Sequence, residues 1–145
     1  MKKLNILIVI FLLAPIFTFL LFSHNNNETH NIIYLHKQKN NSCSSKDLLH
    51  SLSNVGNIIL VFYADWCNPC TRMSQLLEYS GPTLPEYTFI KINRDYFSDI
   101  ADIFRPKGIP TLIFLRDGKE IGRYEGPPLT QKKLIHIIKK IYGAI

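Results

Sequence analysis

The sequence predicts an α/β domain in which helices flank a central mixed β-sheet. Apolar runs of strand length alternate with segments of helical periodicity, which is typical of a sheet whose first strands are parallel. An Asp-Gly turn at Asp117 and Gly118 joins the last two runs and predicts an antiparallel hairpin at one edge. The chain has 145 residues, of which 46% are apolar, and this is enough for one core.

The N-terminal segment, residues 1–22, has the composition of a membrane anchor. Lys2 and Lys3 precede an uncharged apolar run, Leu4–Phe22. Within this run only Asn5, Thr18 and the helix-interrupting Pro15 depart from the composition of a membrane helix. The run is close to the roughly 20 residues of a membrane span and exceeds the apolar stretch of about 7–15 in a cleaved signal. We therefore expect an uncleaved anchor in a bacterial inner membrane, with the domain facing the periplasm. The alternative is signal cleavage, which would leave a soluble periplasmic protein.

A polar stretch, residues 23–31, follows the apolar run and predicts a short tether. The domain is expected over residues 32–145. It begins with a short strand candidate, Ile32–Leu35, and a serine at position 44 or 45 can cap a helix that runs to about Ser53.

Two further apolar runs predict the central strands. Ile58–Tyr63 is continuously apolar, as expected of a strand covered on both faces, and Thr88–Ile92 is the second run. Between them, an apolar stripe predicts a helix from Asn68 to about Tyr79, which Gly81-Pro82 ends. The stripe consists of Met73, Leu76 and Leu77.

The C-terminal part predicts a short helix, a hairpin and a final helix. Asp99–Phe104 can form the short helix before a proline. Thr111–Leu115 and Glu120–Glu125 form the hairpin, and an amphipathic helix runs from about Thr130 to Tyr142. Its inward positions are Leu134, Ile137, Ile138 and Ile141.

The net charge of +6 does not indicate a nucleic-acid partner. Lysines of the last helix are interleaved with apolar residues, and no basic stripe with aromatic residues between its charges occurs. We interpret this charge as a solvated helix face, and we expect a monomeric domain. The lysines concerned are Lys132, Lys133, Lys139 and Lys140.

The run Cys67-Asn68-Pro69-Cys70 carries the chemistry of the chain. A zinc site needs four ligands, but Cys43 and the scattered histidines show no ligand spacing, so no metal site is expected. Haem attachment requires a histidine where Thr71 stands, and a purely structural disulfide across so small a loop would stabilise little. A redox-active pair remains.

The position of the pair explains this chemistry. Cys67 lies where a strand gives way to a helix, so the unpaired N–H groups of the helix start favour its thiolate. Cys70 lies one turn further and can resolve a mixed disulfide by attacking Cys67. We expect Cys67 to be exposed and Cys70 to be shielded. Pro69 suits the first helical turn.

From Ile32 to Tyr142 the chain resembles the thioredoxin family. The run Ala64–Cys70 is similar to the family's active site, with Asn68 in place of the usual glycine, and Gly108–Thr111 is similar to its cis-proline loop. The resemblance implies a thioredoxin fold and a redox-active disulfide in place of a cofactor. It also implies that Ile109–Pro110 is cis and presents the Ile109 backbone to a substrate peptide.

Three further residues take their expected roles from this resemblance. Trp66 would be an aromatic residue of the redox site and of the substrate surface, and Gly126 would line the substrate groove. Lys91 matches a lysine that lies near a buried active-site base.

The chain departs from the family at that base, because Val61 stands where thioredoxins commonly carry a buried aspartate. Asp65 is one substitute, although its place beside Trp66 favours a solvated surface residue. Lys91 is then either solvated or lowers the pKa of a thiol. Cys43 is either a relay thiol near the dithiol or a spare thiol near the tether.

The interpretation is a thiol–disulfide reductase that acts on disulfides of exported proteins. Exported cysteines meet an oxidising compartment, so the enzyme would need a membrane electron donor of the transmembrane thiol-reductase type. Apocytochrome c, in cytochrome c maturation, is one expected substrate class. The alternatives are a disulfide oxidase or isomerase on the same fold, and a non-catalytic module that uses the dithiol for a metal or as a chaperone.

Overall fold

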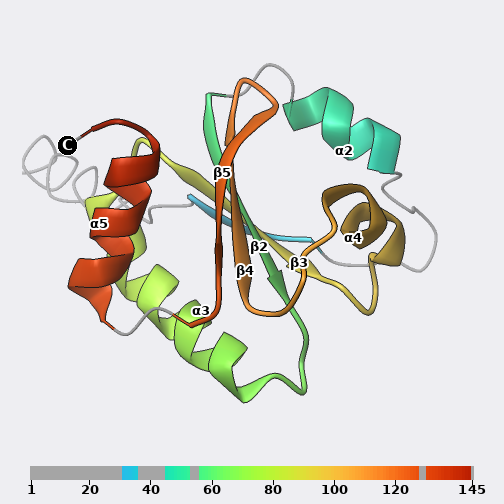
Figure 1. Cartoon of the computed structure of the whole chain (residues 1–145), viewed down its shortest axis with the longest axis horizontal. Coiled ribbons are helices and arrows are strands. Elements are labelled where there is room, and N and C mark those ends of the chain that lie inside the picture. The colour runs from blue at the N-terminus through green and yellow to red at the C-terminus, as the bar shows by residue number, and fades with distance from the viewer. Residues whose placement is uncertain (1–30, 36–44, 53–55, 128–129, 145) are drawn as a thin grey trace, which may run out of the picture.

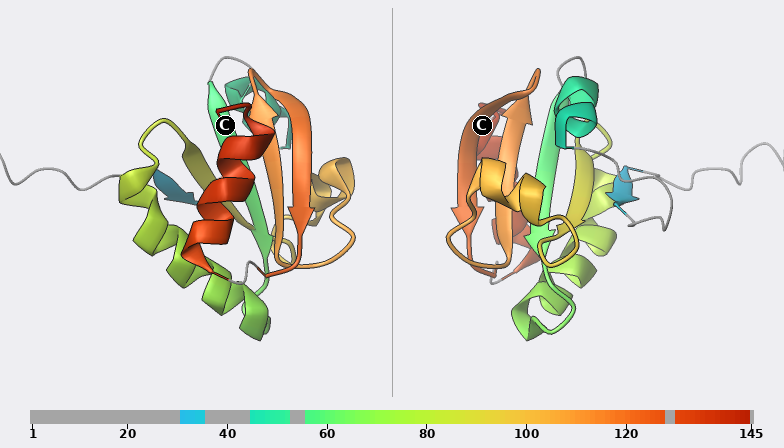
Figure 2. Two further views of the ribbon diagram at one scale, coloured as in Figure 1. Left: turned by 60° about the vertical axis from the view of Figure 1, so that its left-hand side comes forward. Right: turned by 90° about the vertical axis from the view of Figure 1, so that its right-hand side faces the viewer.

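A five-stranded sheet lies between two layers of helices in the computed structural model of the chain (Figures 1 and 2). The structure describes residues 31–35, 45–52, 56–127 and 130–144. The order of elements confirms the predicted alternation, and the bounds differ from those expected by one or two residues. The elements are β1 (Ile32–Tyr34), α2 (Ser45–Leu52), β2 (Asn57–Tyr63), α3 (Asn68–Ser80), the 3₁₀ turn η1 (Gly81–Thr83), β3 (Thr88–Asn93), α4 (Ser98–Phe104), β4 (Thr111–Arg116), β5 (Lys119–Glu125) and α5 (Gln131–Ile141).

The sheet is mixed, as predicted, in the order β1-β3-β2-β4-β5. The first three strands in this order are parallel, whereas β4 and β5 form an antiparallel hairpin at one edge. The hairpin turns at Asp117 and Gly118, whose φ angles of 49° and 74° are those of a two-residue turn that matches strand twist. β2 therefore occupies the centre of the sheet.

The two faces of β2 enter two separate cores, which explains its unbroken apolar sequence. Ile58, Leu60 and Phe62 pack on the face covered by α2 and α4. Ile59 and Val61 pack on the other face, against α3 and α5. The second core also holds Met73, Leu77, Leu84, Tyr87, Phe89, Leu112, Phe114, Leu134, Ile138 and Tyr142.

The last helix is capped at one end and pinned to the sheet at the other. The side chain of Thr130 accepts a hydrogen bond from the backbone N–H of Lys133. The buried hydroxyl of Tyr142 lies 2.7 Å from the carbonyl of Ile58 and 3.0 Å from that of Leu115, on β2 and β4. α5 therefore closes the second core.

The described fold begins at Asn31, one residue before the predicted start of the domain. Its side-chain amide lies within hydrogen-bond distance of the carbonyls of Gly81, Leu84 and Tyr87, and its own carbonyl accepts from the N–H of Phe89. Asn31 therefore belongs with the domain and not with the tether.

The predicted anchor over residues 1–22, the rest of the tether and Cys43 lie outside the described residues. Among the residues that the structure does describe, none of the helices has both the length and the apolar character of a membrane span.

Candidate active site

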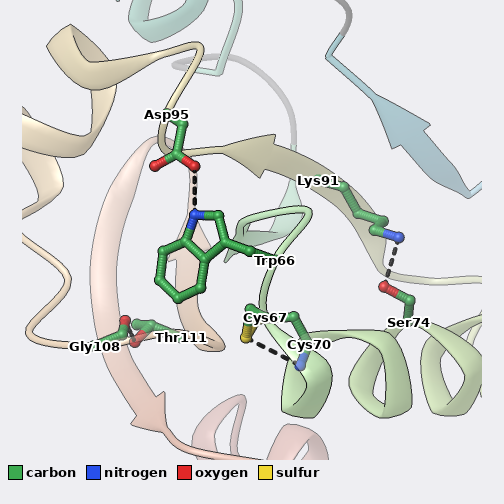
Figure 3. The surroundings of a disulfide bond; sticks show 8 residues. All are labelled: Trp66, Cys67, Cys70, Ser74, Lys91, Asp95, Gly108 and Thr111. Carbon is green, nitrogen blue, oxygen red and sulfur yellow. Dashed lines mark hydrogen bonds between the residues drawn. A yellow bond between two sulfur atoms is a disulfide. The ribbon is translucent and has the colours of Figure 1, made fainter.

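Cys67 follows β2 and is the N-cap of α3, as the sequence predicted. Its Sγ accepts a hydrogen bond from the backbone N–H of Cys70 at 3.2 Å (Figure 3), and the two residues form a disulfide. Pro69 occupies the first turn of the helix, where a missing N–H costs nothing. An N–H group of the first helical turn aimed at Sγ is the arrangement that stabilises a thiolate after reduction.

Both cysteines are buried in the disulfide, so the expectation of an exposed Cys67 is wrong for this state. Cys67 is 5% exposed and Cys70 is 2% exposed. The pair packs with Ala64, and the partly buried side chains of Tyr63 and Ile109 lie against it. These neighbours come from the end of β2, from the residue after it and from the loop before β4, which the sequence motif does not show.

Two hydrogen bonds tie the loop before the cysteines to the loop after β3. The indole N–H of Trp66 donates to Asp95 at 2.8 Å (Figure 3), and the hydroxyl of Tyr96 donates to Asp65 at 3.0 Å. Trp66 is 69% exposed, so its ring forms part of the surface beside the pair. Asp65 is exposed too, as predicted.

The loop before β4 approaches the cysteines from the other side. The Ile109–Pro110 peptide bond is cis, as the family resemblance implied, and Ile109 touches the cysteine pair. The N–H of Gly126 donates to the carbonyl of Pro110 at 2.9 Å. Gly126 has a φ of +97°, a backbone conformation that favours glycine, and none of the described residues has an atom within 4 Å of the place of an added Cβ. It thus lies beside the proline without crowding from the described part of the chain.

Lys91 is buried, so the option of a solvated amine is wrong. Only 4% of the residue is exposed. Its Nζ donates to the Oγ of Ser74 at 2.7 Å (Figure 3) and to the hydroxyl of Tyr34 at 3.3 Å. It also lies over the rings of Tyr34 and Tyr63, 4.3 Å and 5.1 Å from their centroids. Burial lowers the pKa of Lys91 below its ordinary value, against a smaller opposite effect of Glu78.

A pocket of about 200 Å³ opens next to the second cysteine. Its lining residues come from the end of β2, the loop after it and α3. Sequence reasoning did not find Ser74, although its place four residues after Cys70 puts it on the same side of α3. The lining residues are Tyr63, Ala64, Asp65, Cys70, Thr71 and Ser74.

The described part of the chain contains no group of three histidine, cysteine, aspartate or glutamate side chains that could hold a metal ion. The arrangement instead offers a dithiol that can open and close its own disulfide beside an exposed aromatic ring and a cis-proline loop. Fold and site together define the class of thiol–disulfide oxidoreductases.

Comparison with known proteins specifies the family. The model of the family described as Thioredoxin matches residues 39–140, and the chain belongs to the thioredoxin family. It is 39% identical to a thioredoxin of Chlamydia pneumoniae over 71 residues, which is 49% of this chain and 70% of the relative. With a thioredoxin of Chlamydia trachomatis it shares 37% identity over 86 residues, or 59% of this chain and 82% of the relative.

The fold agrees with solved structures. The thioredoxin NaTrxh of Nicotiana alata superposes with a TM-score of 0.64 at 28% identity, over 80% of this chain and 96% of that one. A thioredoxin of Trypanosoma brucei brucei gives a TM-score of 0.62 at 26% identity, over 79% of this chain and 96% of that one. The protein is thus a thioredoxin-like disulfide reductase that uses the Cys67–Cys70 disulfide in place of a cofactor and acts on protein disulfides.

Proposed function

We propose that this chain is a membrane-tethered reductase of disulfides in exported proteins. The observation that carries the location is the uncharged run Leu4–Phe22 behind Lys2 and Lys3, ahead of the redox domain. This segment would hold the domain at the outer face of a bacterial inner membrane. The tether would let the active site reach substrates in the periplasm.

The chemistry follows from the placement of the two cysteines. The thiolate of Cys67 attacks a substrate disulfide, forms a mixed disulfide and releases the first substrate thiolate. The thiol of Cys70 then loses its proton and attacks the Sγ of Cys67, which closes the Cys67–Cys70 disulfide and releases the second substrate thiolate. Each cycle transfers two electrons from the protein to the substrate.

The surface around the pair suits an extended peptide. Trp66 exposes its ring on one side, and Ile109 with Gly126 lies on the other. The backbone of Ile109 would pair with the substrate strand, and the uncrowded position of Gly126 would leave room for it. Asn68, exposed at the start of α3, would lie next to the bound chain.

The oxidised enzyme must be reduced again for the next cycle. An oxidising compartment supplies few electrons, so we propose a membrane partner that passes electrons from the cytoplasm to the Cys67–Cys70 disulfide. Thiols of apocytochrome c, kept reduced for haem attachment, are the proposed substrate class. The short tether, residues 23–31, would keep the domain within reach of such a membrane partner.

The direction of electron flow is tested by the reduction potential of the pair in the chain from His24 onward, equilibrated against glutathione. A value near or below about −230 mV supports a reductase that depends on a membrane donor. A value above about −180 mV would make the protein an oxidase or isomerase and would overturn the proposed direction.

The location is tested by fusing alkaline phosphatase to the C-terminus of the full chain in a Gram-negative host. Phosphatase activity and an intact N-terminus in the membrane fraction are expected. An inactive fusion would contradict export, and an active soluble fusion would show that the segment is cleaved. Fusion to a cytoplasmic reporter provides the reciprocal control.

A further inference from the structure

The resolving step needs an acceptor for the proton of Cys70. Val61, on the strand that leads to the cysteines, is 1% exposed and apolar, and so offers none. A thiol attacks a disulfide only as the thiolate. Another polar group must therefore serve Cys70, and this inference rests on the reductase activity described above.

Two polar groups lie in line behind Cys70. Cys70 and Ser74 are one helical turn apart on α3, and both line the pocket of about 200 Å³. The pocket is large enough to hold water in contact with its lining. From β3, the Nζ of Lys91 reaches the Oγ of Ser74 at 2.7 Å (Figure 3). A hydrogen-bonded path thus leads from the pocket to a buried amine.

The surroundings of Lys91 favour proton exchange. Burial without a carboxylate partner disfavours the ammonium form. Among the described residues, no carboxylate forms an ion pair with Lys91. Glu78 raises its pKa by less than burial lowers it, and the hydroxyl of Tyr34 lies between the two, accepting from Lys91 and donating to Glu78 at 2.7 Å. The amine therefore lies against the hydroxyls of Ser74 and Tyr34, and the Ser74 hydroxyl can exchange a proton with it.

We propose that Ser74 and Lys91 form the proton relay that serves Cys70 when it resolves the mixed disulfide. The proton of the Cys70 thiol passes through pocket water and the Ser74 hydroxyl to the neutral amine of Lys91, which becomes an ammonium. The Cys70 thiolate attacks the Sγ of Cys67, the Cys67–Cys70 bond forms, and the mixed disulfide breaks. The substrate leaves as a thiolate, and the ammonium later returns its proton to water.

Asp65 is the competing acceptor because it lines the same pocket. Its carboxylate, however, is exposed and accepts the hydrogen bond of Tyr96. A solvated carboxylate that already has a donor is less available than a buried amine in contact with Ser74. Asp65→Asn therefore provides a matched control in the same pocket.

The relay predicts a specific pH dependence. Tyr34 on β1, Tyr63 on β2 and Glu78 on α3 are the titratable groups that face Lys91. The relay needs the neutral amine, so the rate of resolution rises with pH through the pKa of Lys91, which burial lowers from its ordinary value. Replacing Lys91 should remove this inflection.

The test uses the reduced full chain in detergent, with Cys43→Ser so that only the pair reacts. A single turnover with 5,5′-dithiobis(2-nitrobenzoate) releases one nitrothiobenzoate when Cys67 attacks and a second when Cys70 resolves. Ser74→Ala, Lys91→Met and Lys91→Arg should slow the second release by about 10²-fold or more and leave the first unchanged. Arginine retains the charge but cannot accept the proton.

Each result decides between explanations. Normal resolution in Lys91→Arg would mean that a cation suffices and would overturn the relay. Equal slowing of both releases would indicate a structural role, and slowing by Asp65→Asn alone would assign the proton to Asp65. If Lys91→Met does not fold, Ser74→Ala and the pH profile carry the test. Failure of the parent protein to release either thiolate would instead contradict the reductase function.

Discussion

The contact that fixes the C-terminal helix can be tested by Tyr142→Phe. The Tyr142 hydroxyl lies 2.7 Å from the carbonyl of Ile58 and 3.0 Å from that of Leu115, and the residue is 7% exposed. The change removes the hydroxyl and keeps the ring, so no large cavity forms. A hydroxyl has one proton to donate, so the expected loss is that of one buried hydrogen bond, about 1–2 kcal/mol of the free energy of unfolding.

The measurement is urea denaturation followed by far-UV circular dichroism, on the chain from Ser23 onward. The midpoint should fall while the slope stays the same, because the folded surface does not change. Tyr124→Phe is the matched control, since its hydroxyl makes a long bond of 3.3 Å to Pro127 in an exposed place. If Tyr142→Phe cost no more than Tyr124→Phe, the reasoning about the buried bond would be refuted.

Three further predictions concern the cysteines, the start of the domain and Tyr34, the tyrosine that accepts a hydrogen bond from Lys91. Cys67→Ser should abolish insulin reduction, whereas Cys70→Ser should trap mixed disulfides visible on non-reducing gels; an active Cys67→Ser protein would contradict the mechanism. Asn31→Ala removes an amide whose nitrogen lies within hydrogen-bond distance of three carbonyls and can donate two hydrogen bonds, so urea denaturation should show a loss of about 1–3 kcal/mol, and no loss would mean that Asn31 is not part of the fold. Burial and the hydrogen bond to Glu78 raise the pKa of Tyr34 to about 12, above the 10 of the unfolded chain. The stability that this gives is present below pH 10 and is lost between pH 10 and 12, so the stability of Tyr34→Phe should fall less over that range.

The fold could be predicted from the sequence because its signals are local. The unbroken apolar run of β2 predicts burial on both faces. Asp117-Gly118 predicts a tight hairpin independently of contacts elsewhere in the chain. The handedness of the connections then indicates that helices cover both faces, whereas the order of the strands was not predicted. The position of Asn31 was missed because a single asparagine in a polar stretch carries no local signal of a tertiary contact.

The residues of the candidate site also differ in whether a local sequence signal identifies them. Cys67 and Cys70 form a contiguous motif and were found, whereas Ser74, Asp95 and Tyr96 were not, because they join the site only through packing between α3, β3 and the loops. Lys91 was found but its burial was left open. Lysine is almost never fully buried without a partner, and its partners here lie on other strands and on a helix.

The sheet topology explains why these separated segments meet at one place. β2 and β3 are parallel, so the loop with the cysteines and the loop with Asp95 leave the same end of the sheet. β4 is antiparallel to β2, so its start, after Pro110, lies at that end as well, and the end of β5 brings Gly126 beside it. The sequences of the loops at this end of the sheet can change without disturbing the hydrogen bonds between the strands.

Val61 and Lys91 lie within the strands, further from the sheet end than these loops, and they are paired positions of β2 and β3. A polar group at that depth finds its hydrogen-bond partners on the adjoining strand or helix. With an apolar residue on β2, the amine of Lys91 depends on Tyr34 of β1 and Ser74 of α3. Ser74 is also the group that faces the pocket of Cys70. The side chain that satisfies the buried amine is thus the one that joins it to the reacting thiol. Ser74→Ala should therefore slow the resolving step of Cys70 and leave the first attack by Cys67 unchanged.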